Sequence, residues 1–140
     1  MIRPHRSVVI TSWNFLSDDV LGMTPAEAAY ELTQRAVRCQ FVAPREAPPG
    51  ATLKEWGRTG KAPFWACLAA VDLLMEHGWL PDNEVEWSVL AHLWLRAHGP
   101  FANIREVSQA LPEYLAEGVR YFELAFEDTR LFQARNRESS

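Results

Sequence analysis

Five of the six tryptophans of this 140-residue chain fall within 39 consecutive residues, from Trp56 to Trp94. The same stretch holds two segments that are almost wholly apolar, 62–77 and 83–98. Burial of aromatic area between packed helices is a main source of stability for a small domain. The cluster therefore predicts a mainly α fold, a helical domain built around a central antiparallel pair of helices at 62–77 and 83–98.

Length and composition fit one compact domain over residues 1–140, of which 48% are hydrophobic. Cys39 and Cys67 stand inside apolar runs rather than in a spaced framework, which indicates free buried thiols that ionise poorly. The sequence contains no apolar run that suits a signal-peptide core or a membrane span. We therefore expect a soluble cytoplasmic protein that does not associate with membranes.

The first 43 residues predict a strand–helix–strand start. Residues 7–13 form a β-branched run, which is typical of a strand. A capping box of Thr24 and Glu27 marks the start of the helix that follows. The short apolar run 39–43 predicts a second strand beside the first. The helical fold is thus expected to carry a small strand-containing N-terminal portion.

Residues 44–63 predict a long irregular connection, because they hold four prolines and three glycines. Loops of this length are usually functional or mobile, and this one leads into a helix whose N-terminal amides favour an anion. The run 57–61 is not a Walker A phosphate loop, since Glu55 stands where that motif needs its first glycine. The segment remains a possible anion-binding loop through its basic and aromatic side chains Lys54, Trp56, Arg58 and Lys61.

The sequence predicts that residues 64–135 form the helical core and that residues 136–140 form a short tail. A long C-terminal helix, from about Pro112 to Arg135, completes the core. Its helical wheel separates an apolar face from a charged face. The apolar face comprises Leu115, Val119, Phe122, Ala125, Phe126 and Phe132, with Tyr114 and Tyr121 at its margin.

The charged face of this helix is the predicted partner interface. Residues 72–128 hold three basic and eleven acidic side chains, so this region attracts basic partners and repels phosphates. Leu124 and Leu131 fall in the middle of the charged face, and apolar side chains among acids are typical of a contact surface. In an alternative, the N-terminal segment covers both leucines within the monomer. The predicted interface comprises Glu113, Glu117, Arg120, Glu123, Leu124, Glu127, Asp128 and Leu131.

The sequence contains no complete catalytic, metal-binding or cofactor-binding constellation. Its four histidines lack the spacing of a helical or knuckle metal site. His92, in a polar strip with Ser88, is the one candidate general base, and such a dyad would need a third, orienting group. The segment 83–98 is not a DNA-reading helix, since it presents acidic and apolar side chains instead of base-contacting ones. These observations favour a protein without enzymatic activity, metal or cofactor.

The sequence thus favours a non-catalytic protein–protein interaction module, such as an adaptor, an inhibitor or an assembly subunit. The expected partner is another protein with a basic surface, or a second copy of the chain. One alternative is a small-molecule-binding, anion-binding or enzymatic domain that uses the loop 44–63. A second alternative is single-stranded nucleic-acid binding through this loop and the arginines Arg130, Arg135 and Arg137. The acidic region makes nucleic acid the less expected partner.

Overall fold

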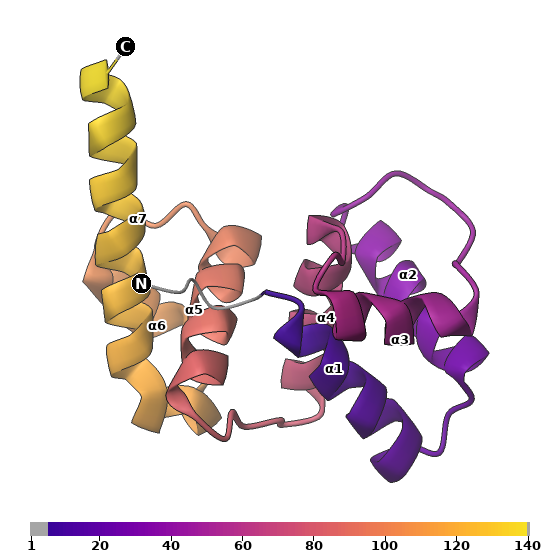
Figure 1. The fold of residues 1–140 in the computed structure, drawn as a ribbon. Coiled ribbons are helices and arrows are strands. Elements are labelled where there is room, and N and C mark those ends of the chain that lie inside the picture. Colours follow the sequence, from indigo (N-terminus) through magenta and orange to yellow (C-terminus); the bar gives the residue numbers. More distant parts are fainter. Residues whose placement is uncertain (1–5, 140) are drawn as a thin grey trace. The chain divides into compact units, whose positions relative to one another are not determined.

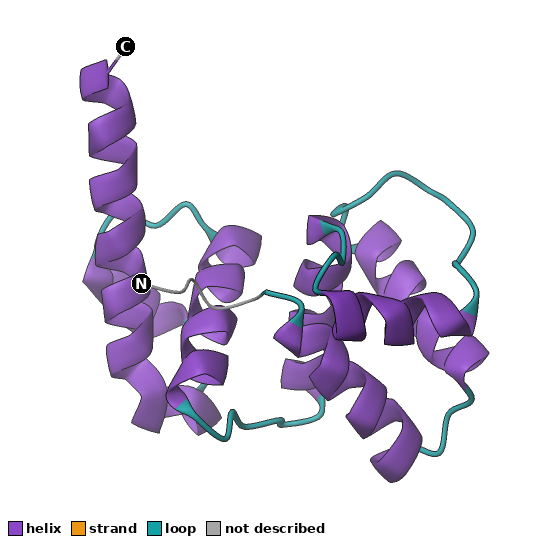
Figure 2. Ribbon diagram, in the orientation of Figure 1, coloured by secondary structure: helices purple, strands orange, loops and turns teal. Residues whose placement is uncertain are grey.

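Seven α-helices and no strand form between residues 6 and 139 in the computed structural model (Figure 2). The structure describes these residues, and it describes the side chains of residues 6–129. The prediction of a mainly α fold is confirmed. The prediction of a strand-containing N-terminal portion is wrong. Within the described range, every helix is too short or too polar to cross a membrane.

The chain divides into two units, each with its own helices (Figure 1). Unit 1, Met1–Leu80, contains α1 (Val8–Phe15), a π-helical segment (Leu16–Val20), α2 (Pro25–Arg38), α3 (Gly50–Thr59) and α4 (Phe64–Glu76). Unit 2, Pro81–Ser140, contains α5 (Glu84–His98), α6 (Ile104–Ala110), a 3-10 segment (Glu113–Gly118) and α7 (Val119–Ser139). The single domain over residues 1–140 stays a prediction.

The predicted strand at 7–13 is part of helix α1. Val9, Ile10 and Trp13 lie at helical spacing and all three side chains are fully buried. The indole Nε1 of Trp13 donates a hydrogen bond to the carbonyl oxygen of Ala28 in α2, at 3.2 Å. The β preference of valine and isoleucine is weak and depends on context, so these tertiary contacts outweigh it.

Helix α2 begins and ends much as its caps predict. The Thr24 hydroxyl accepts a hydrogen bond from the Glu27 backbone N–H, and the Glu27 carboxylate accepts one from the Thr24 N–H. The second strand predicted at 39–43 is wrong. Gln40 has a φ of 63°, in the left-handed region, and the Phe41 N–H bonds back to the last turn of α2. The chain therefore turns here instead of extending.

Half of the predicted irregular connection 44–63 is helix α3, so that prediction is wrong for these residues. Pro49 precedes the first helical residue, and Gly60, with a φ of 74°, ends the helix as a left-handed cap. Leu53 is buried, and its carbonyl oxygen accepts a hydrogen bond from the Asn14 side chain of α1 at 3.1 Å. Pro49, Gly50 and Gly60, which suggested a loop, thus mark the two ends of a helix.

The two apolar helices predicted at 62–77 and 83–98 exist as α4 and α5, but their central antiparallel pairing is not confirmed. Within unit 1, α4 packs mainly against α2 and α1. Within unit 2, α5 packs mainly against α7. A helix that is apolar on most sides needs several neighbours to cover it, and each of these helices is covered by helices of its own unit.

Aromatic rings form the core of unit 2. Trp94 stacks on Phe101 with ring centroids 5.4 Å apart and meets Phe122 edge to face at 5.4 Å. Trp87 stacks on Tyr121 at 5.7 Å, with only 7° between the ring planes. These contacts hold α7 alongside α5, and the two helices run in the same direction (Figure 1). The tryptophan cluster therefore does mark a core, as predicted for this part of the chain.

The predicted C-terminal helix begins as the 3-10 segment and continues as α7. Gly118 lies at the junction, where an added Cβ would stand 2.1 Å from the Trp87 ring. A glycine is therefore required for the close approach of these two residues. Beyond the junction, Phe122 and Ala125 are buried on the predicted apolar face of the helix. That buried face determines which side chains α7 presents to solvent.

Candidate functional site

The charged face of α7 exposes an apolar side chain, Leu124, which keeps 57% of its surface in contact with solvent. Exposed Arg120 and Asp128 lie one helical turn before and after it. Buried Phe122 and Ala125 hold the opposite side of the helix in the core of unit 2. The exposure of Leu124 is therefore fixed by the packing of α7.

The other predicted interface residues divide into three groups. Glu113 and Glu117 are exposed but belong to the 3-10 segment, so they continue the face with a different helical twist. Glu123 and Glu127 are half-buried. The side chain of Leu131 lies outside the described residues, as do residues 1–5 of the segment that was predicted to cover the leucines. Three of the predicted carboxylates, Glu123, Glu127 and Asp128, thus lie within about one helical turn of Leu124, at or near the surface.

His92 links α5 to α7 instead of forming a dyad with a serine hydroxyl. Its Nδ1 lies 2.8 Å from the backbone carbonyl oxygen of Ser88, and its Nε2 lies 3.3 Å from Oδ2 of Asp128. The first nitrogen is therefore directed to the backbone rather than to the Ser88 hydroxyl. The contact with Asp128 fixes one acid of the α7 face against α5.

The two cysteines are poor nucleophiles, as predicted. Burial raises the pKa of the Cys67 thiol to about 11. Burial, and then the charge of Asp72, raise the pKa of the half-buried Cys39. Both thiols therefore keep their protons near neutral pH. The described part of the chain places no three His, Cys, Asp or Glu side chains together where they could hold a metal ion.

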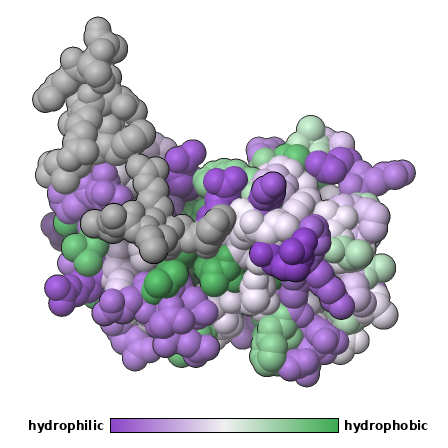
Figure 3. Space-filling model, viewed as in Figure 1, coloured by the Kyte–Doolittle hydropathy of each residue, from purple (hydrophilic) through white to green (hydrophobic). Residues whose placement is uncertain are grey.

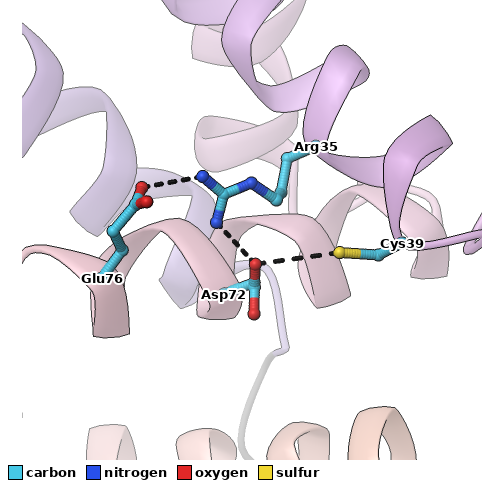
Figure 4. Close-up of polar contacts among 4 residues, drawn as sticks. All are labelled: Arg35, Cys39, Asp72 and Glu76. Atoms are coloured by element: carbon cyan, nitrogen blue, oxygen red, sulfur yellow. Dashed lines mark hydrogen bonds and ion pairs between the residues drawn. The ribbon is translucent and has the colours of Figure 1, made fainter.

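A salt-bridge cluster between α2 and α4 is a feature that the sequence did not predict (Figure 4). The Arg35 guanidinium donates to Oδ2 of Asp72 at 2.6 Å and to Oε2 of Glu76 at 2.8 Å. Burial opposes the charge on Arg35, but its hydrogen bonds to the two carboxylates outweigh this and raise its pKa. The signal for this cluster was a pair of acids one turn apart on an otherwise apolar helix. Because all three charges are paired, the cluster fastens two helices together.

The predicted anion-binding residues lie mostly on a helix rather than on a loop. Lys54 is exposed on α3, and Lys61 is exposed in the link to α4. Arg58 forms an ion pair with Glu55 on the same helix, at an exposed position. Trp56 is half-buried. Its ring meets Trp65 of α4 edge to face, with the centroids 6.0 Å apart.

Two further arginines join this region: Arg45, which belongs to the predicted basic loop 44–63, and Arg6. The Arg45 guanidinium lies 5.0 Å over the Trp65 ring, and that of Arg6 lies 5.7 Å over the Phe64 ring. Both contacts join α4 to residues at least 20 positions away in the chain, so no local pattern could reveal them. We take these contacts together with the exposed Lys61 of the link between α3 and α4. We call this set the arginine–tryptophan surface: Arg6, Arg45, Trp56, Lys61 and Trp65.

Comparison with known proteins yields no relative, because no family model, curated protein or solved structure matches the chain. The function of the protein is therefore inferred from its own residues. On the face shown in Figure 3, hydrophilic side chains predominate and hydrophobic ones form small separate groups. The fold and its surfaces define a helical protein with two candidate binding regions, the charged face of α7 and the arginine–tryptophan surface.

Proposed function

We propose that the protein is a non-catalytic interaction module that binds another protein through the charged face of α7. The observation that carries the proposal is the exposure of Leu124, 57% of whose surface meets solvent among acidic neighbours. Isolated exposed leucines are common on soluble proteins. A leucine surrounded by carboxylates differs, because it offers a partner both an apolar anchor and a defined sign of charge.

The partner that fits this face is a protein with a basic surface around an apolar depression. Residues 81–129 carry nine acidic and three basic side chains, which would speed the encounter with a basic partner. Burial of Leu124 would then slow dissociation, and the sequence suggests that Leu131 extends the same contact. A two-fold dimer through this face would bring like charges together, so a basic partner fits better than a second copy. Adaptor, inhibitor and assembly-subunit roles all use such a contact.

The test compares three immobilised baits: the wild-type chain, Leu124→Asp and the matched control Val85→Asp. Val85 is an exposed apolar residue of the same unit, 51% exposed, so its replacement makes the same chemical change outside the proposed face. We expect the wild-type and control baits to capture a basic protein that elutes with salt. With that protein purified, Leu124→Asp should weaken binding about tenfold or more, because burial of a leucine contributes about 1.5–3 kcal/mol.

Equal binding of the purified partner by wild type and Leu124→Asp would refute the proposal. Light scattering after size-exclusion chromatography tests the choice of partner. A wild-type dimer that Leu124→Asp dissociates would replace the basic partner by a second copy of the chain.

A further inference from the structure

Three cations of the arginine–tryptophan surface are not neutralised by carboxylates. Arg6, Arg45 and Lys61 are exposed, and none of them lies within ion-pair distance of an acid among the described residues. Arg35 and Arg58, in the same unit, are both paired with acids. Cations without acidic partners are available to phosphate groups.

The aromatic rings of this surface adjoin one of these cations, Arg45. Arg45 lies over the face of Trp65, and the Trp56 ring meets Trp65 from α3. Both tryptophans are half-buried, so their inner parts are held in unit 1 while part of each ring meets solvent. A guanidinium and a nucleobase are both planar groups that stack on an indole face. A base could therefore take the place of Arg45 on Trp65 while the arginine moves to the neighbouring phosphate.

We propose that the arginine–tryptophan surface binds single-stranded nucleic acid, with bases stacked on Trp65 and Trp56 and phosphates at Arg6, Arg45 and Lys61. Cations interleaved with aromatic side chains are the features by which proteins bind single strands without sequence preference. The contributing residues come from three separate segments of the chain, which suits an extended strand better than a single nucleotide. Residues 1–80 carry eight basic and eight acidic side chains, so this unit lacks the acidic excess of residues 72–128.

This surface and the proposed protein-binding face belong to different units of the chain and share no residue. The arginine–tryptophan surface belongs to α3, α4 and the segments before α1 and α3. The acidic neighbours of Leu124 belong to unit 2. A failure of one proposal therefore leaves the other standing.

The experiment measures the fluorescence anisotropy of a fluorescein-labelled oligothymidylate of about 20 nucleotides, titrated with the full-length protein at several salt concentrations. Three neutralised phosphates predict that the logarithm of the binding constant falls against the logarithm of salt concentration with a slope of about −2. The double variant Arg45→Ala, Lys61→Ala should bind about tenfold more weakly and reduce the slope to about −0.7. The matched control is Arg38→Ala, an exposed arginine of the same unit outside the surface, which should leave binding unchanged.

The role of stacking is tested separately. Unlabelled oligothymidylate should quench the intrinsic tryptophan fluorescence, Trp65→Phe should retain binding, and Trp65→Leu should weaken it. Because Trp65→Leu could also impair folding, circular dichroism accompanies it, and the Arg45 and Lys61 variants provide an independent test.

Unchanged binding by the Arg45→Ala, Lys61→Ala variant, or no binding at low salt, would overturn the proposal. Equal competition by polyglutamate would show that the surface selects charge alone and takes an acidic protein. Equal affinity for thymidine monophosphate would show a mononucleotide site, and equal affinity for duplex DNA would exclude base stacking. Each of these three results would also overturn the proposal.

Discussion

Gly118→Ala is expected to destabilise unit 2, although alanine is the better helix former. The backbone at Gly118 lies outside the left-handed region, so alanine can adopt it without strain. Taken alone, the substitution would stabilise the chain by up to about 1 kcal/mol. The new Cβ, however, would lie 2.1, 2.4 and 2.5 Å from three carbon atoms of the Trp87 ring. The contact with Trp87 therefore decides the sign of the effect.

The size of the effect follows from how little Trp87 can move. Carbon atoms pack at about 3.5–4 Å, so the ring would have to retreat by about 1.4 Å. Trp87 is buried and stacks on Tyr121 with 5.7 Å between ring centroids, so any retreat disturbs a second ring on α7. Overpacking of this kind costs about 1–3 kcal/mol. With a gain in helix propensity of about 1 kcal/mol subtracted, we expect the free energy of unfolding to fall by up to about 2 kcal/mol.

The assay is urea unfolding followed by circular dichroism, on the wild type, Gly118→Ala, Trp87→Phe and the double variant. Phenylalanine removes the ring atoms that the new Cβ would meet. Gly118→Ala should therefore cost less in the Trp87→Phe background than in the wild type. An alanine variant as stable as the wild type, or an equal cost in both backgrounds, would refute the reasoning.

Three further predictions concern unit 1. Arg35→Leu should lower the free energy of urea unfolding by about 1–3 kcal/mol, because it leaves the half-buried Asp72 carboxylate without its partner, and Asp72→Asn in that background should restore part of the loss. The Cys67 pKa rises from 9.0 to about 11 on folding, so the folded thiol keeps a proton that the unfolded thiol loses between these values. Stability should therefore fall by up to about 3 kcal/mol as the pH rises through this window, and Cys67→Ala should lack this component. Thr24→Ala should cost about 1 kcal/mol in thermal or urea unfolding, whereas Thr24→Ser should keep the cap.

Each of these three predictions has a result that contradicts it. If Arg35→Leu unfolded at the same midpoint urea concentration as the wild type, the salt-bridge cluster would not stabilise the packing of α2 against α4. The same dependence of stability on alkaline pH in wild type and Cys67→Ala would assign that dependence to other groups. If Thr24→Ala and Thr24→Ser lost the same stability, the loss would not come from the capping hydroxyl, which serine keeps and alanine lacks.

The sequence predicts those elements whose boundaries are set by their own residues. Thr24 and Glu27 bond to each other's backbone, so the start of α2 can be recognised within four residues. The segment 7–13 lacks such a local signal. Its helical state depends on the burial of Trp13 and on the hydrogen bond from that indole to α2. Local β preference alone therefore gave the wrong result there.

The candidate surfaces likewise include some features set by nearby residues and others set by tertiary contacts. The exposure of Leu124 could be predicted because the helical wheel of α7 is a local property. Arg45 lies in the predicted basic loop, but its contact with the Trp65 ring could not be predicted, and neither could the contact of Arg6 with α4. Both contacts form only through the tertiary fold. Arg58 is a basic residue two positions after Trp56, as a basic binding site would need, yet the nearby Glu55 forms an ion pair with it. A basic residue close to an aromatic residue in the sequence therefore indicates a binding surface only once the structure shows which carboxylates pair with it.

The two proposed surfaces can be separated by exchanging their variants and assays. Leu124→Asp changes the α7 face of unit 2 and no residue of the arginine–tryptophan surface, so oligothymidylate binding should stay close to that of the wild type. Conversely, Arg45→Ala should leave capture of the basic protein intact, because Arg45 belongs to unit 1. Loss of oligothymidylate binding in a folded Leu124→Asp variant would show that the α7 face takes part in it. In that case the two surfaces would act as one, and the acidic residues near Leu124 would have to be explained by something other than a basic protein.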